Sequence, residues 1–140
     1  MVCLLVQRRL MVLLLSASLI ALVGCGQGKN ENLGEVSGTI TLDGEPLKHA
    51  VITFQPQGGR PAFGKTGDDG KYTLMYSASE AGATIGLNKV TITNGGERRN
   101  EETDEVWYQK EQVPPKYNAR TELEYDVKPG AQTYDVVLET

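Results

Sequence analysis

Residues 36–47 read VSGTITLDGEPL, and residues 50–54 continue as AVITF after Lys48-His49. Apolar and polar side chains alternate along both segments, which is typical of strands with one buried and one solvated face. Asp43-Gly44 lies within the first segment and tolerates the positive φ angles of a tight turn. This run therefore predicts a β-hairpin at the start of an all-β domain.

The same alternation continues toward the C-terminus. A short strand is also expected at 62–66, and Asp69-Gly70, Asn94-Gly95 and Pro129-Gly130 read as turns. Six or seven short strands separated by such turns favour a β-sandwich. The positions expected to face inward are Val36, Ile40, Leu42, Ala50, Ile52, Phe54, Tyr72, Leu74, Tyr76, Val90, Ile92, Leu123, Tyr125, Val127, Tyr134, Val136 and Leu138.

The connection 94–120 breaks this pattern. Residues 98–112 are rich in glutamate and compatible with a short helical turn, whereas 113–118 should be extended because of its two prolines. We expect 95–104 to be mobile and 106–117 to be ordered. The aromatic residues Trp107, Tyr108 and Tyr117 either pack this connection onto a sheet face or contact a ligand or partner.

The N-terminal segment has the features of a secretory signal peptide. Arg8 and Arg9 precede an apolar run of about 14 residues, shorter than the roughly 20 that span a bilayer. The run ends in Leu22-Val23-Gly24-Cys25, which resembles a bacterial lipobox. That resemblance implies a diacylglyceryl group on the Cys25 thiol, cleavage after Gly24 and acylation, for example by palmitate, of the new amine.

Three segments follow from these features. Residues 1–24 are the expected signal peptide, 25–33 the lipidated cysteine with a polar tether, and 34–140 the β-sandwich domain. A flexible tether of this length reaches roughly 15 Å, so the domain should lie near the membrane.

Charge and cysteine content exclude several classes of protein. The chain has 14 basic and 18 acidic residues; without Arg8 and Arg9 the net charge falls from −4 to −6. Such an acidic domain does not favour nucleic acid, which requires clustered Lys and Arg. Cys3 lies in the signal peptide and Cys25 is consumed by the lipid, so no disulfide is expected.

No catalytic, metal or cofactor site is predicted. His49 is the only histidine, whereas catalytic zinc usually has two or three. Asp68-Asp69-Gly70 lacks the alternating oxygen ligands of a calcium loop and is interpreted as a turn.

Several motifs together resemble carboxypeptidase regulatory-like domains. These are the opening hairpin 36–54, the segment 66–74 (TGDDGKYTL) and, as in short bacterial lipoproteins with one such domain, VPPKYN at 113–118 and VKPG at 127–130. The resemblance implies a seven-stranded Greek-key β-sandwich of the transthyretin (prealbumin) type, without zinc. The related hydroxyisourate hydrolases need several histidines and a C-terminal Tyr-Arg-Gly-Ser, but this chain ends in Val137-Leu138-Glu139-Thr140.

The sequence thus predicts a membrane-anchored lipoprotein of the cell envelope that is not an enzyme. Its expected role is structural, adhesive or protein-binding; the alternative is a carbohydrate- or peptide-binding module that uses Trp107 and Tyr108. Gly26, rather than Asp, follows the lipidated cysteine, which favours the outer over the inner membrane. The periplasmic and cell-surface faces both stay open, as do an envelope protein and a glycan as partners.

Overall fold

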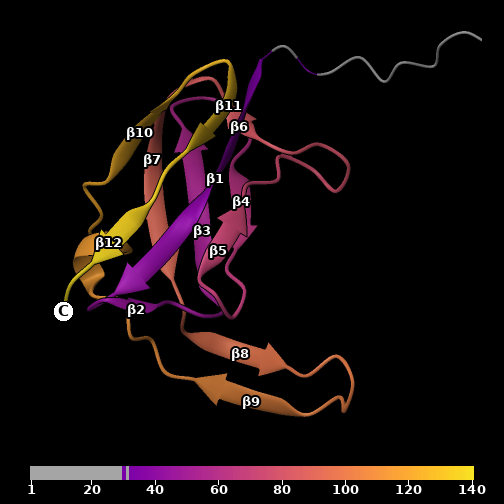
Figure 1. Cartoon of the computed structure of the whole chain (residues 1–140), viewed down its shortest axis with the longest axis vertical. Coiled ribbons are helices and arrows are strands. Elements are labelled where there is room, and N and C mark those ends of the chain that lie inside the picture. Colours follow the sequence, from indigo (N-terminus) through magenta and orange to yellow (C-terminus); the bar gives the residue numbers. More distant parts are fainter. Residues whose placement is uncertain (1–29, 31) are drawn as a thin grey trace, which may run out of the picture.

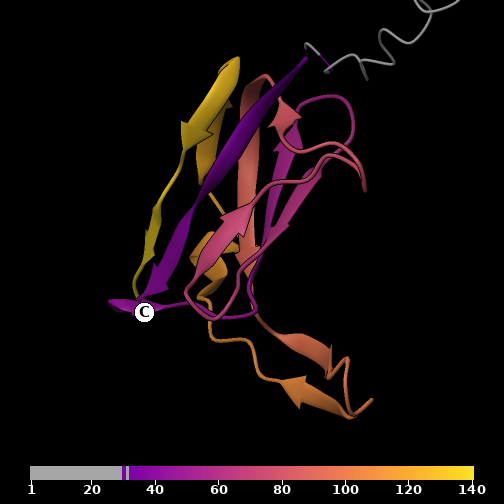
Figure 2. The same cartoon turned by 45° about the vertical axis from the view of Figure 1, so that its right-hand side comes forward.

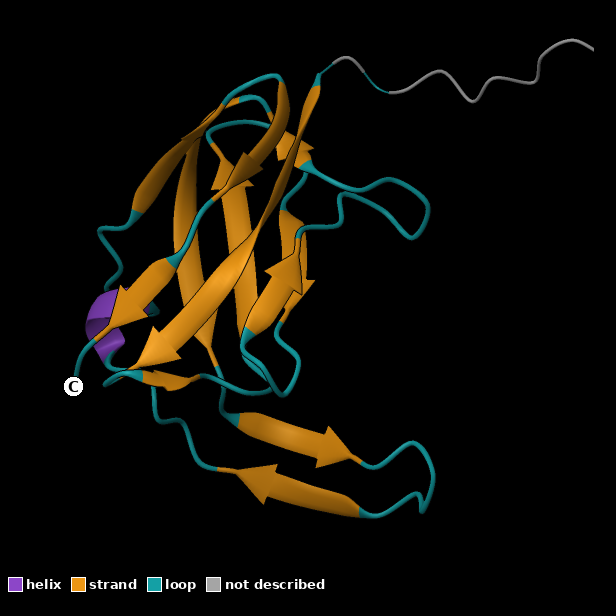
Figure 3. Cartoon of the chain, in the orientation of Figure 1, coloured by secondary structure: helices purple, strands orange, loops and turns teal. Residues whose placement is uncertain are grey.

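The computed structural model describes residue 30 and residues 32–140. The expected signal peptide, Cys25 and most of the tether lie outside the described residues. The described chain is a β-sandwich whose two sheets face each other, with a separate two-stranded ribbon projecting from one end (Figures 1 and 3). The only helical segment in this part is the 3-10 turn η1, Pro115–Tyr117.

The first sheet is built around the long strand β1, Leu33–Leu42. Along one side, β11 (Gly130–Thr133) and β12 (Val136–Leu138) pair with it in parallel, one after the other. Along the other side lie three short antiparallel strands: β6 (Ala83–Thr84), β5 (Lys71–Thr73) and β2 (Glu45–Pro46).

The second sheet is antiparallel and has the order β10-β7-β3-β4. Its strands are β10 (Glu124–Val127), β7 (Gly86–Thr93), β3 (Val51–Pro56) and β4 (Ala62–Lys65). The predicted short strand near 62–66 is therefore confirmed. Its pairing with β3 places Ala62 opposite Phe54.

The core between the sheets is made by the alternating apolar residues. Of the positions expected to face inward, most are buried, and the buried set includes Val36, Ile40, Ile52, Phe54, Leu74, Val90, Ile92, Val127 and Leu138. Leu42, Leu123, Tyr125 and Tyr134 are partly buried and pack against this cluster. The predicted strand register is confirmed, because a shift by one residue would have exposed each of these side chains.

Contacts between the two layers close both long sides of the sandwich. On one side, the backbones of Phe63 and Met75 exchange hydrogen bonds of 3.0 and 2.8 Å. On the other side, the rings of Tyr125 and Tyr134 lie 4.3 Å apart, and both contact Phe54. The two sheets are thus joined along their edges as well as through their core.

The connection 94–120 differs from the sequence expectation. Instead of a loop with a possible helical turn, β8 (Gly96–Arg99) and β9 (Val106–Gln109) form an antiparallel ribbon. The proline-containing segment is extended at Pro114, with φ −59° and ψ 149°, but turns into η1 immediately afterwards. A hairpin forms because β-favouring Val106, Trp107 and Tyr108 find a partner strand in 96–99.

A candidate binding ribbon

The β8–β9 ribbon extends from the end of the sandwich opposite the start of β1 (Figures 1 and 2). Its register places Arg98 opposite Trp107 and Glu97 opposite Tyr108. Consecutive strand residues point to opposite faces, so Trp107 shares one face with Arg98, and Tyr108 shares the other with Val106.

Three consecutive apolar side chains of the ribbon are exposed. The exposed fractions are 54% for Val106, 46% for Trp107 and 77% for Tyr108. The expectation that Trp107 and Tyr108 pack the connection onto a sheet face is therefore wrong. They are exposed because the ribbon extends beyond the sandwich and has no sheet beneath it.

Hydrogen bonds hold the base of the ribbon in place. The Glu111 carboxylate accepts hydrogen bonds from the backbone N–H groups of Asn94, Gly95 and Val113, at 3.0, 3.2 and 3.0 Å. The buried Asn94 amide donates to the Gln112 side chain and accepts from the Gln112 backbone. We call Asn94, Glu111 and Gln112 the clamp, because they join the chain entering the ribbon to the chain leaving it.

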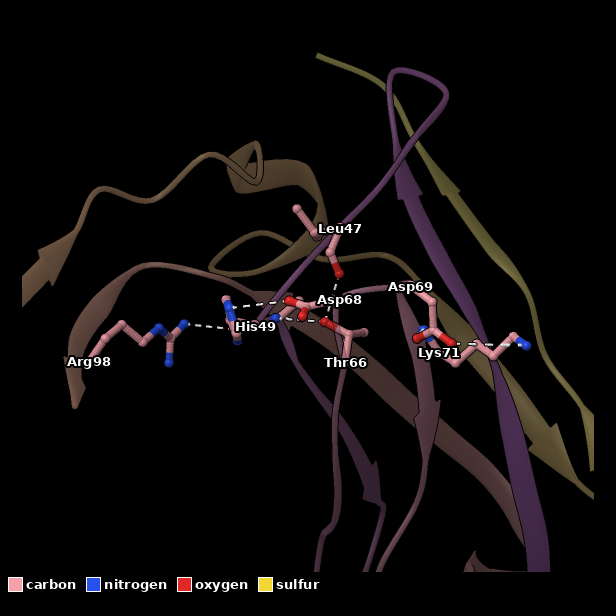
Figure 4. A network of polar contacts seen from close by, with 8 residues as sticks. Leu47, His49, Thr66, Asp68, Asp69, Lys71 and Arg98 are labelled. Atoms are coloured by element: carbon pink, nitrogen blue, oxygen red, sulfur yellow. Dashed lines mark hydrogen bonds and ion pairs between the residues drawn. The ribbon is translucent and has the colours of Figure 1, made fainter. Parts of the chain in front are cut away.

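Arg98 connects the ribbon to the loop that precedes β3. Its guanidinium donates a hydrogen bond of 2.8 Å to the carbonyl oxygen of His49 (Figure 4) and another of 2.8 Å to that of Asn94. His49 adopts a positive φ of 54°, and its imidazole lies 3.8 Å from Asp68. These hydrogen bonds orient the ribbon through Arg98. The His49 side chain is half-exposed beside a turn, and its backbone carbonyl supports the ribbon.

The same loop is fixed from within by Thr66. The buried hydroxyl of Thr66 donates to the Leu47 carbonyl at 2.6 Å and accepts from the Ala50 N–H at 2.8 Å (Figure 4). The carbonyl that Arg98 contacts therefore belongs to a rigid loop.

The tip of the ribbon is also well defined. The Asn100 side chain accepts hydrogen bonds from the backbone of Glu102 and Thr103, and Arg99 forms an ion pair of 2.9 Å with Asp104. The segment 95–104, expected to be a mobile loop, forms strand β8 followed by a hydrogen-bonded turn. The signal in the sequence was Asn100, which favours an Asx turn.

Tyr117 does not join Trp107 and Tyr108. Tyr117 is the last residue of η1 and packs against the core, and its hydroxyl oxygen accepts a hydrogen bond of 3.2 Å from the Glu139 backbone. Of the three aromatic candidates, the structure brings only Trp107 and Tyr108 onto one element. Tyr117 instead ties the C-terminal segment to the sandwich.

Sequence reasoning missed the clamp and Arg98. Asn94-Gly95 reads as an ordinary turn, and Glu111 reads as one of many acidic residues. Their role depends on the approach of residues 17 or 18 positions apart in the chain.

The described residues contain no group of three or more His, Cys, Asp or Glu side chains suited to a metal ion. Nor does this part of the chain include a helix long and apolar enough to cross a membrane. Cys25 lies outside the described residues.

Comparison with known proteins identifies no family for this chain. No family model matches the chain, and no curated protein matches it. Among solved structures, a DUF3823 family protein from Parabacteroides merdae is 15% identical, with a TM-score of 0.42 over 79% of this chain and 46% of that chain. A 9R-lipoxygenase from Cyanothece is 14% identical, with a TM-score of 0.36 over 79% of this chain and 17% of that chain. The chain thus spans less than half the length of either structure, and similarity at this level carries no functional argument.

Proposed function

We propose that this protein is a lipid-anchored protein-binding module of the cell envelope, and that it is not an enzyme. In this proposal residues 1–24 are a signal peptide and Cys25 carries the lipid. The domain would be a carboxypeptidase regulatory-like sandwich with the transthyretin-like Greek-key topology. The motifs at 36–54 and 66–74 support that relationship.

The observation that carries the proposal is the exposed ribbon. Val106, Trp107 and Tyr108 are apolar and exposed, yet the clamp and Arg98 hold their strand in one orientation. Aromatic residues dominate the binding energy of many protein interfaces, and a pre-oriented element loses less entropy on binding. An ordered strand with exposed aromatic side chains is well suited to contact a partner.

The position of the tether supports this role. β1 begins at one end of the sandwich and its ten residues run about 30 Å toward the end that carries the ribbon (Figure 2). With a lipid on Cys25, the start of β1 would lie near the membrane. The ribbon would then be held away from the bilayer, where a partner can reach it.

Peptide or protein binding fits the ribbon better than carbohydrate binding. Trp107 and Tyr108 lie on opposite faces of β9 and do not form one flat surface on which a sugar ring could stack. A carbohydrate site would need to use each ring separately. We therefore propose a protein partner and treat a glycan as the alternative.

The anchor has a direct test. The wild-type chain, expressed in bacteria fed an alkyne palmitate analogue, should incorporate the label and fractionate with membranes. Cys25→Ser should incorporate none, and Gly24→Ala, which keeps a small residue before the cut, should label normally. An unmodified Cys25 in the mass spectrum of the mature protein would contradict the anchor. The absence of Asp at Gly26 supports the outer membrane, and separation of the two membranes tests that location.

The binding role is tested by photo-crosslinking in intact cells. A photoreactive amino acid at Tyr108 should yield a discrete protein adduct. The same residue at Val137, which is 68% exposed but lies on β12, is the matched control. Equal adducts at both positions, or none at Tyr108, would contradict a role for the ribbon.

A further inference from the structure

The backbone of β9 has a free edge. The Asn100 N–H donates to the Glu105 carbonyl at 2.9 Å, which makes this a hydrogen-bonded pair. Such pairs alternate along an antiparallel ladder, so Arg98–Trp107 is bonded, whereas Arg99–Val106 and Glu97–Tyr108 are not. The N–H and C=O groups of Val106 and Tyr108 therefore point away from β8.

Within the described chain, no strand other than β8 pairs with β9. β9 is short, but its four residues Val106–Gln109 include neither proline nor lysine, two residues that commonly protect an edge strand. The edge beside Tyr108 can therefore accept a further strand.

The charge of the ribbon selects the partner. Residues 96–109 contain five acidic residues and two arginines. Arg99 is paired with Asp104, and Arg98 donates to backbone carbonyls, so neither guanidinium offsets Glu101, Glu102 or Glu105 directly. A second copy of the chain would bring two acidic ribbons together. A positively charged segment would be attracted to the same place.

We propose that the free edge of β9 binds an extended, positively charged segment of another protein by β-strand addition. The inference rests on the proposed function, because it names how the ribbon would bind. Backbone hydrogen bonds to Val106 and Tyr108 would provide affinity, and the acidic tip would favour Lys and Arg on the added strand.

The test uses a displayed library of random nine-residue peptides and the membrane-purified full chain in neutral phosphatidylcholine nanodiscs. Peptides retained by the wild type are counter-selected against Tyr108→Pro, which removes an outward-pointing N–H and leaves the ladder to β8 intact. Tyr108→Val, which keeps the N–H, is the matched control, and circular dichroism checks that each variant is folded. Binding of synthetic peptides is followed by the fluorescence of Trp107, the only tryptophan.

Selected peptides should carry an excess of Lys and Arg. The substitution Tyr108→Pro should weaken their binding by at least about tenfold more than Tyr108→Val does. N-methylation of alternate peptide nitrogens on the pairing edge should cause a similar loss. Failure to select any peptide, selection without positive charge, or full binding after N-methylation would overturn the inference. An adduct at Tyr108 in cells together with any of these results would leave the ribbon as a binding surface while excluding the addition of a positively charged strand.

Discussion

At Gly38 the first sheet has no room for a side chain. A Cβ placed there would lie 2.0 Å from the carbonyl oxygen of Tyr134, in the stretch of chain that passes from β11 to β12. Beside it, the Thr39 N–H donates to the Asp135 carboxylate at 2.8 Å, and the Tyr134 N–H donates to the Ser37 carbonyl. Gly38 therefore allows one strand to pair with two successive strands.

Gly38→Ala should be strongly destabilising, because the new methyl group meets backbone rather than a movable side chain. We expect the free energy of unfolding, measured by chemical denaturation, to fall by about 3 kcal/mol or more, which is the upper end of the usual cost of overpacking. Gly58→Ala is the control, since a Cβ at that position meets no atom within 4 Å. Equal stability of the two variants would mean that the junction of β11 and β12 lies elsewhere.

Phe54 is the largest fully buried side chain among the described residues. Its ring contacts Tyr125 and Tyr134, at centroid distances of 5.8 and 6.0 Å. Phe54→Ala should reduce the free energy of unfolding by about 3–5 kcal/mol, as measured in urea. A loss below about 1 kcal/mol would indicate a different strand register.

Tyr72 makes the stability of the fold depend on pH in the alkaline range. Burial, with smaller contributions from Tyr134 and Asp135, raises the pKa of Tyr72 well above its usual value, and its hydroxyl donates to the Tyr134 carbonyl at 2.6 Å. The unfolded chain loses this proton near pH 10 while the folded chain keeps it. The contribution of Tyr72 to the free energy of unfolding is therefore complete below pH 10. It declines above pH 10, because the unfolded chain can release the proton there and the folded chain cannot.

Denaturation at several alkaline pH values should show this decline in the wild type and a shallower one in Tyr72→Phe. At neutral pH the variant should lose about 0.5–1.5 kcal/mol, the usual net value of one hydrogen bond. Burial also raises the pKa of Tyr134, so a residual slope should persist in the variant. Identical slopes would exclude Tyr72 as the source.

At the scale of elements, we expect the order of the ribbon to depend on the clamp at its base. Glu111 supplies three of the hydrogen bonds of the clamp, and a Cβ on Gly95 would lie 2.8 Å from the Glu111 Cβ. Paired strands resist proteases better than turns do, so a Glu-specific protease should cut the wild type at Glu101 or Glu102. Trypsin should cut slowly at Arg98 and Arg99.

Glu111→Ala should raise the rate of tryptic cleavage at Arg98 and Arg99 several-fold, because the entering and leaving strands separate. Peptide mass mapping identifies the cut sites. Glu122→Ala, which removes a carboxylate outside the clamp, should leave the pattern unchanged. Rapid tryptic cleavage of the wild type at both arginines would show that the ribbon is frayed without any mutation.

At the scale of the whole molecule, we expect one end of the sandwich to lie near the membrane and the end with the ribbon to lie away from it. Ala131 pairs with Glu35 near the start of β1, whereas Thr103 lies at the tip of the ribbon. If Cys25 is lipidated and Cys3 is removed, as we propose, a single introduced cysteine can be labelled selectively. We expect a fluorophore on Ala131→Cys to be quenched by spin-labelled lipids in vesicles and one on Thr103→Cys to be quenched much less. Equal quenching would mean that the ribbon also lies on the membrane.

The strands and their buried faces could be read from the order of the residues alone. Apolar side chains at every second position, such as Ile52 and Phe54, can be removed from water only on one face of a strand, so local pattern and burial agree. The turns at Asp43-Gly44 and Asp69-Gly70 follow for the same local reason. Gly44 and Gly70 have positive φ angles that glycine adopts without strain.

Features that depend on distant segments could not be read in this way. The exposure of Trp107 and Tyr108 follows from whether a sheet lies beneath them, and no local pattern contains that information. The clamp joins Asn94 to Glu111, Arg98 reaches His49, and Gly38 meets Tyr134. Each of these pairs is created only when the chain folds, because side-chain periodicity determines which face a residue takes but not which segment it meets there.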